Sequence, residues 1–237
     1  MDSKGKYIGL NQRIPFDVLD MSIHNYIVNG VIDRANILQH MLEYTSGINR
    51  ASKATAYVVQ ILNRQERVIG VLKSALKDTS YSALKIDDRK AIALCLISLT
   101  YPITYDLLIA LAQGYKVQDQ INKKFINEKV MSIYGSNRTV DIAIDALLPM
   151  IIELNTIKRD KVSLYSLGSK LSITFKIVYE MVVYTDIKLS GSKSILLDDL
   201  AHRPWYSYFV VTFADGGNFT KLITHKDSAV GKGYLTI

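Results

Sequence analysis

The sequence predicts a mainly α-helical protein with a small β element at its C-terminal end. The chain of 237 residues holds only four prolines, and its apolar residues recur over long stretches at the 3.6-residue period of amphipathic helices. After Lys158 this pattern gives way to strand-like alternation. A hydrophobic content of 49% excludes disorder for most of the chain. The single cysteine, Cys95, cannot form an internal bridge, which indicates a reducing compartment.

Capping residues set the boundaries of the expected helices. Pro15 suits the first turn of a helix that Gly30 ends, and Asp33 suits the N-cap of a second helix that stops at Gly47. The third helix is the clearest, because its apolar residues form one continuous stripe. Pro149 predicts a kink or an early stop in the last helix. The expected helices cover residues 15–30, 33–47, 52–76, 87–99, 104–112, 117–130 and 136–151.

The remaining chain is expected to mix strands and helices. Residues 161–167 suit a strand and 194–202 a short helix, whereas 171–184 fit either, with a helix favoured because the run is long for a strand. Residues 206–214 and 219–225 predict a hairpin with its turn at Asp215-Gly216. We therefore expect a helical domain with a helix-turn-helix (1–112), a winged-helix-like domain (113–190) and a C-terminal helix plus β hairpin (191–237).

A basic helix face in the first domain is the first candidate for function. Two helices joined by a short turn containing Gly47 follow the helix-turn-helix plan, in which the second helix can enter a major groove. Opposite its apolar stripe, this second helix carries a basic and amide ladder about 20 Å long. The alternative is an ordinary solvated outer face. The ladder consists of Lys53, Gln60, Arg64 and Arg67, with Arg50 near its N-terminal end.

Residues 117–167 form the second candidate. A turn at Gly135-Ser136, a helix starting Asn137-Arg138-Thr139-Val140, a basic turn at residues 157–161 and an aliphatic strand resemble a winged helix-turn-helix. The outward face of the helix carries carboxylates that repel phosphate, so DNA contact would be limited to the first turn and the basic turn. The residues available there are Ser136, Asn137, Arg138 and Thr139 in the first turn, and Lys158, Arg159 and Lys161 in the basic turn. Otherwise the unit binds protein or is architectural. The repelling carboxylates are Asp141, Asp145 and Glu153.

Together, two helical modules with Ser/Thr-containing helix starts resemble the small A component of bacterial BREX phage-defence systems. The matching pieces are Ser52-Lys-Ala-Thr-Ala56, followed by Ile61 and Arg64, and Ser136-Asn-Arg-Thr-Val140. The segment after Ser190 has no counterpart. The resemblance implies a mainly helical, cytoplasmic protein with winged-helix-like parts that is linked to DNA binding.

No motif predicts catalysis, a metal or a cofactor. Cys95 lies in an apolar run, which predicts a core residue rather than a nucleophile. The charge-free run 91–105 is shorter than the roughly 20 residues of a membrane span and contains Pro102, so we expect two short buried helices and no membrane partner. The histidines show no metal-binding spacing; they are His24, His40, His202 and His225.

We therefore expect a cytoplasmic, non-catalytic protein that binds double-stranded DNA. Its net charge of +7 is spread along the chain, so any basic patch has to come from folding. The alternative is an adaptor in a larger assembly that binds protein partners through its tyrosine-rich C-terminal half. There, Arg203 beside Trp205 suits either a stacking surface or, as favoured, an anchor for the C-terminal element. The tyrosines concerned are Tyr165, Tyr179, Tyr184, Tyr206, Tyr208 and Tyr234.

Overall fold

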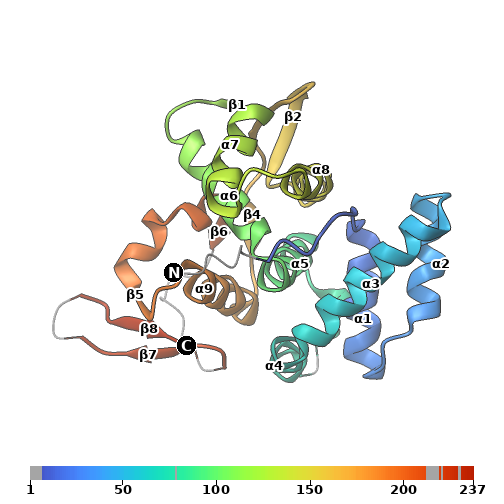
Figure 1. Ribbon diagram of the computed structural model, residues 1–237. Coiled ribbons are helices and arrows are strands. Elements are labelled where there is room, and N and C mark those ends of the chain that lie inside the picture. Colours follow the sequence, from blue (N-terminus) through green and yellow to red (C-terminus); the bar gives the residue numbers. More distant parts are fainter. Residues whose placement is uncertain (1–6, 78, 212–218, 220, 229–230) are drawn as a thin grey trace, which may run out of the picture.

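The computed structural model describes residues 7–77, 79–211, 219, 221–228 and 231–237. It confirms a mainly helical fold with small β elements (Figure 1). The described residues contain the helices α1 (Phe16–Asn29), α2 (Arg34–Tyr44), α3 (Ile48–Arg64), α4 (Glu66–Leu76), α5 (Ile86–Thr100), α6 (Ile103–Tyr115), α7 (Lys123–Tyr134), α8 (Arg138–Glu153) and α9 (Lys176–Ser190), and the short 3-10 helix η1 (Tyr81–Ala83).

Helix α5 lies at the centre of the molecule, with α3 and α9 on either side of it (Figure 1). Its residues from Ala91 to Ile97 are buried on every face, as expected for a core helix. The predicted caps of the neighbouring helices are confirmed. Asp33 accepts a hydrogen bond from the backbone N–H of Asn36 (3.0 Å), and Gly30 ends α1 in the left-handed conformation with φ of 69°.

The predicted single helix over 52–76 is wrong, because the chain bends at Gln65 and forms two helices. Gln65 leaves the helical conformation (φ −106°, ψ 18°), and its side-chain amide donates to the hydroxyl of Thr100 (3.2 Å). The apolar stripe stays buried on both sides of the bend, since Val58 belongs to α3 and Leu72 to α4. The apolar spacing therefore continues without interruption through the break at Gln65, where the side chain is bonded to Thr100 of another helix.

The middle of the chain has the element order of a winged helix. Helix α6 is followed by β1 (Gln120–Asn122), α7, α8, β2 (Ile157–Lys161) and β3 (Leu164–Leu167). The three strands form an antiparallel sheet in the order β1-β3-β2. Asn137 caps α8 by accepting from the backbone N–H of Val140 (3.2 Å), which confirms the predicted helix start.

Several details of this region differ from the prediction. The expected helix over 117–130 begins only at Lys123, after β1. Helix α8 continues through Pro149 to Glu153 rather than stopping early. Residues 157–161 form a strand and not a turn; the turn follows at Val162-Ser163, where Ser163 has φ of 59°. The β2–β3 hairpin, here called the wing, therefore carries the predicted basic segment on a strand.

The C-terminal part contains strands that pair differently from the predicted hairpin. Residues 171–184 form a short strand and then a helix, and 194–202 a strand and a 3-10 helix. Strand β6 pairs in parallel with β4, whereas β7 pairs with β8, which also pairs with β5. The Asp215-Gly216 turn lies outside the described residues. The elements are β4 (Leu171–Ile173), β5 (Ser194–Leu196), η2 (Leu197–His202), η3 (Pro204–Tyr208), β6 (Phe209–Val211), β7 (Thr224–Lys226) and β8 (Tyr234–Thr236).

Buried carboxylates fasten the C-terminal segments to the helical core. Asp88 on α5 accepts from the backbone N–H (2.9 Å) and the hydroxyl (2.6 Å) of Thr174. Glu180 on α9 accepts from three successive backbone N–H groups, at 2.8, 2.6 and 2.9 Å. These hydrogen bonds replace the hydration that the two carboxylates lose on burial. The three amides belong to Lys221, Leu222 and Ile223.

The buried apolar residues form one cluster that extends across the three predicted domains. The predicted boundary at residue 112 falls inside α6, and α9 of the second predicted domain packs against α5 of the first. The division into three domains therefore stays a prediction. Burial raises the pKa of the Cys95 thiol to about 12, which confirms a core residue. Among the described residues no single helix meets the length and hydropathy of a membrane span. The pair α5 and α6 does so only together, across a bend of 114°.

Candidate nucleic-acid interface

The cations of the predicted α3 ladder are exposed but do not form one surface. Arg50, Lys53 and Arg64 lie on α3, whereas Arg67 lies on α4 beyond the bend at Gln65. None of these four side chains forms an ion pair with another described residue. The charges are therefore available, but the straight ladder that the sequence predicts does not exist.

Residues 7–15, here called the N-terminal segment, cover the middle of this α3 face. The hydroxyl of Tyr57 donates to the side-chain oxygen of Asn11 (2.7 Å). The amide of Gln60 lies 3.2 Å from the hydroxyl of Tyr7 and 2.9 Å from that of Tyr101. When the amide oxygen faces Arg64, it also accepts from that guanidinium (2.8 Å). Gln60 is thus occupied by its own chain, although the sequence places it as an outward-facing group.

Arg50 has a different environment from Lys53. It lines a cavity of about 170 Å³ together with Arg13 and Tyr44, at the junction of α2, α3 and the N-terminal segment. Lys53 is exposed on α3 and forms no ion pair with another described residue. A duplex lying along α3 would therefore meet the N-terminal segment at Tyr57 and Gln60.

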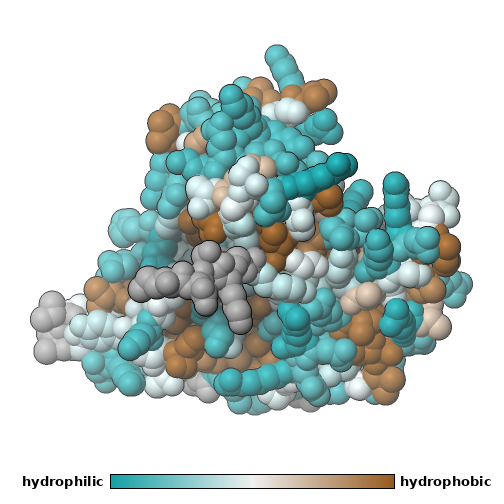
Figure 2. All heavy atoms as spheres, in the orientation of Figure 1, coloured by the Kyte–Doolittle hydropathy of each residue, from teal (hydrophilic) through white to brown (hydrophobic). Residues whose placement is uncertain are grey.

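The second predicted set is more open. Arg138 is the first residue of α8, and Lys158 and Arg159 lie on β2 in the wing. All three side chains are exposed, and none forms an ion pair within the described part of the chain. Figure 2 shows mainly hydrophilic side chains over the region of α7 and β2. Figure 1 places this region apart from α3, so the two predicted sets do not merge.

The acid inside the wing, Asp160, is exposed and bonded to neighbouring strands rather than paired with a described cation. Both carboxylate oxygens of Asp160 accept hydrogen bonds, one from the side-chain amide of Gln120 on β1 (2.9 Å) and one from the hydroxyl of Ser166 on β3 (3.0 Å). These bonds fix the carboxylate against the sheet. Lys161, which the prediction places in the same basic turn, is another exposed cation at the end of β2.

The structure also changes the role of the acids on α8. Asp145 pairs with Lys123 of α7, and Glu153 pairs with Arg13 of the N-terminal segment (2.9 Å). Asp141 accepts from the amide of Asn127 (2.8 Å), which orients its charge without neutralising it. Two of the three repelling charges are therefore compensated within the molecule. Sequence patterns could not show this, since Arg13 and Glu153 are 140 residues apart.

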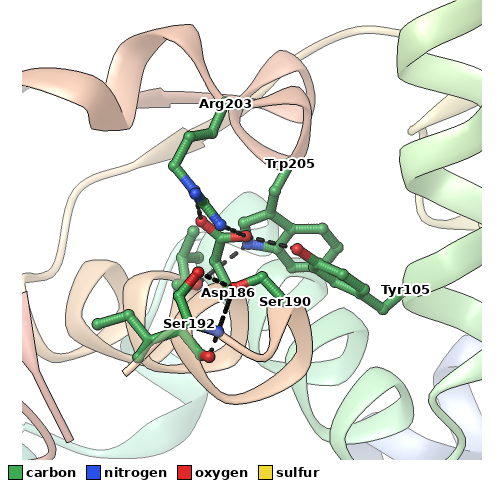
Figure 3. Close-up of polar contacts among 8 residues, drawn as sticks. Tyr105, Asp186, Ser190, Ser192, Arg203 and Trp205 are labelled. Carbon is green, nitrogen blue, oxygen red and sulfur yellow. Dashed lines mark hydrogen bonds and ion pairs between the residues drawn. The ribbon is translucent and has the colours of Figure 1, made fainter. Parts of the chain in front are cut away.

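The C-terminal aromatic cluster is structural. Trp205 is fully buried, and its indole N–H donates to the backbone oxygen of Val182 on α9 (3.0 Å). Arg203 forms a two-pronged ion pair with the buried Asp186, as Figure 3 shows. The anchor alternative is thus confirmed, and Arg203 does not serve a stacking surface with Trp205.

The described residues show no metal centre, and the comparisons with known proteins assign no function to the chain. Within the described residues no group of three or more His, Cys, Asp or Glu side chains comes together in a way that could hold a metal ion. No family model, curated protein or solved structure matches this chain. The resemblances to winged-helix proteins and to the BREX component therefore stay predictions, and the functional argument depends on geometry and charge.

Proposed function

We propose that this protein binds double-stranded DNA without catalysing a reaction, and that the winged-helix unit makes the main contact. One observation carries the proposal. Lys158 and Arg159 are exposed on strand β2 of the wing. Arg138 is exposed at the start of α8, the helix that directly precedes β2. The wing's own acid, Asp160, is exposed and accepts from Gln120 and Ser166, so it keeps its charge but forms no ion pair with the described cations.

The contact would be mainly electrostatic. Each cation that neutralises a phosphate releases condensed counterions, so the logarithm of the binding constant falls by about 0.9 per phosphate against the logarithm of salt concentration. Three cations give a slope of about −2.7. The N-terminal backbone amides of α8 and the helix dipole favour phosphate at the same place.

Helix α3 has a lesser role in this proposal than the sequence alone suggests. Gln60 and Arg64 are engaged by Tyr7, and Arg67 lies beyond the bend. Arg50 and Lys53 stay exposed and would add contacts only if the duplex extended from the wing toward the helical part.

The adaptor alternative keeps little of the tyrosine surface on which it depends. Of the C-terminal tyrosines, Tyr165, Tyr184, Tyr206 and Tyr208 are buried, and Tyr179 is half-buried. Only Tyr234 of the predicted set is exposed, at 40%. Tyrosines that fill the core cannot form the rim of a protein interface.

A salt titration of binding to random-sequence duplex DNA tests the proposal. The double variant Lys158→Gln/Arg159→Gln is expected to flatten the slope by about 1.8, the share of two phosphates. The matched control Lys53→Gln/Arg64→Gln removes the same charge from α3 and should leave the slope nearly unchanged. Circular dichroism melting shows whether each variant stays folded.

Two results would contradict the proposal. A slope that flattens only in the α3 variant would move the interface to α3. A wild-type protein that fails to retain duplex DNA even at low salt would reject DNA binding altogether and leave the adaptor function. Cytoplasmic location and a part in phage defence remain proposals that rest on the resemblance alone.

A further inference from the structure

A cavity of about 410 Å³ lies where the C-terminal ends of α3, α5, α7 and α9 meet the start of α6. Its size falls within the range of small-molecule sites. Residues from the helical part, the winged-helix unit and α9 all contribute to its walls. The lining includes Tyr7, Arg64, Tyr105, Asp106, Tyr134 and Lys188.

Two cations and one acid are among the described residues that line this cleft. Arg64 enters from α3 and Lys188 from α9, so the two cations come from different walls. Both side chains are exposed, and neither forms an ion pair with another described residue. Asp106 is the acid among the described lining residues, and the interactions of its carboxylate include a bond from the hydroxyl of Tyr134 (2.7 Å).

The rest of the lining favours an aromatic group. Tyr105 and Tyr134 are each only 5% exposed, and their hydroxyls donate to the carboxylates of Asp186 (2.6 Å) and Asp106. With their hydroxyls engaged, these side chains offer ring carbon rather than free donors to a ligand. Tyr7 adds a half-exposed ring, over which the Arg64 guanidinium already lies at 5.1 Å.

We propose that this cleft binds a small organic anion that carries a planar aromatic group, with the anionic end held between Arg64 and Lys188. The aromatic group would lie against the tyrosine rings, where offset and edge-to-face contacts are favourable. A charge-assisted contact to Arg64 and Lys188 would supply most of the discrimination against neutral analogues. This proposal does not depend on DNA binding.

The chain contains its own reporter for this site. Trp205 is its only tryptophan, and its ring centroid is 5.2 Å from that of Tyr105. Figure 3 shows the two rings beside each other, with the Tyr105 hydroxyl on Asp186. A ligand that packs against Tyr105 should therefore change the fluorescence of Trp205.

The test uses the full chain and three probes: phenyl phosphate, benzyl alcohol and inorganic phosphate. Titration of Trp205 fluorescence and calorimetry should show saturable binding of phenyl phosphate. The neutral aromatic and the bare anion, which each lack one half of the proposed chemistry, should bind at least about tenfold more weakly. Equal affinity for phenyl phosphate and benzyl alcohol would overturn the proposal, as would absence of phenyl phosphate binding.

Charge-removing variants locate the site. Arg64→Met and Lys188→Met should each weaken phenyl phosphate binding about tenfold, the effect of losing one charge-assisted contact. Lys53→Met on α3 and Lys176→Met on α9 remove an exposed cation from the same helices but outside the cleft, and they should leave the affinity unchanged. If the control variants weaken binding as much as the cleft variants, the anion binds by general surface charge and the assignment is wrong.

Discussion

The guanidinium of Arg64 lies over the ring of Tyr7, 5.1 Å from its centroid, so the N-terminal segment occupies part of the α3 face. The sequence places Arg64 on a free cationic ladder, fifty-odd residues away from Tyr7. The same arginine lines the cleft between the helical part, α6 and α9. Arg64 is thus a residue of an internal junction as well as of the surface.

Replacing Tyr7 with alanine separates these roles. Tyr7→Ala removes the cation–π contact and the hydroxyl near Gln60, so the free energy of unfolding should fall by about 0.5–1 kcal/mol, as for an exposed pair. Affinity for duplex DNA should stay within about twofold, because the wing is untouched. Tyr7→Phe, which keeps the ring, is the control for the lost hydroxyl. A marked gain in DNA affinity would show that Tyr7 masks an α3 interface.

The ion pair between Asp186 and Arg203 is expected to be important for stability. The Asp186 side chain is 1% exposed and that of Arg203 25%, and Asp186 also accepts from Tyr105. Asp186→Asn leaves the arginine without its counter-charge in a poorly solvated place, which should cost about 2–4 kcal/mol in chemical denaturation. Asp198→Asn breaks the exposed pair with Lys232 and should cost less than about 0.5 kcal/mol. Equal losses would mean that burial does not determine the strength of these pairs.

Two glycines should respond in opposite directions to alanine. A Cβ on Gly168, after β3, would collide with the carbonyl oxygen of Asn155 and lie 2.7 Å from its carbonyl carbon. Both are backbone atoms, so Gly168→Ala should destabilise the protein by about 3 kcal/mol and loosen the sheet from α8. Gly70 lies inside α4 with nothing within 4 Å of an added Cβ, and Gly70→Ala should stabilise by about 0.5–1 kcal/mol. Thermal melting of both variants measures the difference, and destabilisation by Gly70→Ala would contradict the packing of α4.

Burial also predicts the behaviour of the protein in alkali. Desolvation raises the pKa of Tyr81, Tyr206 and Tyr208 well above the ordinary value of 10.0. Above pH 10 the unfolded chain loses these protons while the folded chain keeps them, so the unfolded state binds fewer protons and stability falls as pH rises. Below pH 10 this stabilisation is fully present. Each such tyrosine lowers the unfolding free energy by up to about 1.4 kcal/mol per pH unit above 10.

Absorbance of tyrosinate, followed with circular dichroism, checks this prediction. The buried tyrosines should ionise only when the helical signal is lost, in one cooperative step. Ionisation of all tyrosines near pH 10 with an intact helical signal would refute the burial of this group.

The sequence predicted the helices well where local physics determines them. Asp33 and Asn137 cap helices through bonds to N–H groups three residues ahead, and Gly30 ends one, so these boundaries follow from residues a few positions apart. It failed where the outcome depends on distant partners. Gln65 bends a continuous apolar pattern because Thr100 lies beside it, and β6 and β7 join different sheets although their spacing fits a hairpin.

The same division holds for the candidate interface. Periodicity by itself placed Lys53 on the outer side of a helix, because a charged side chain is costly to bury and the apolar face decides which side turns inward. Arg138 is exposed at the predicted helix start, whereas Lys158 is exposed on a strand and not in the predicted turn. Only the tertiary structure decided which cations are already engaged. It laid Tyr7 on Arg64 and paired Glu153 with Arg13, contacts between residues far apart in the chain. Charge compensation depends on distances in space, and these exist only once the chain has folded.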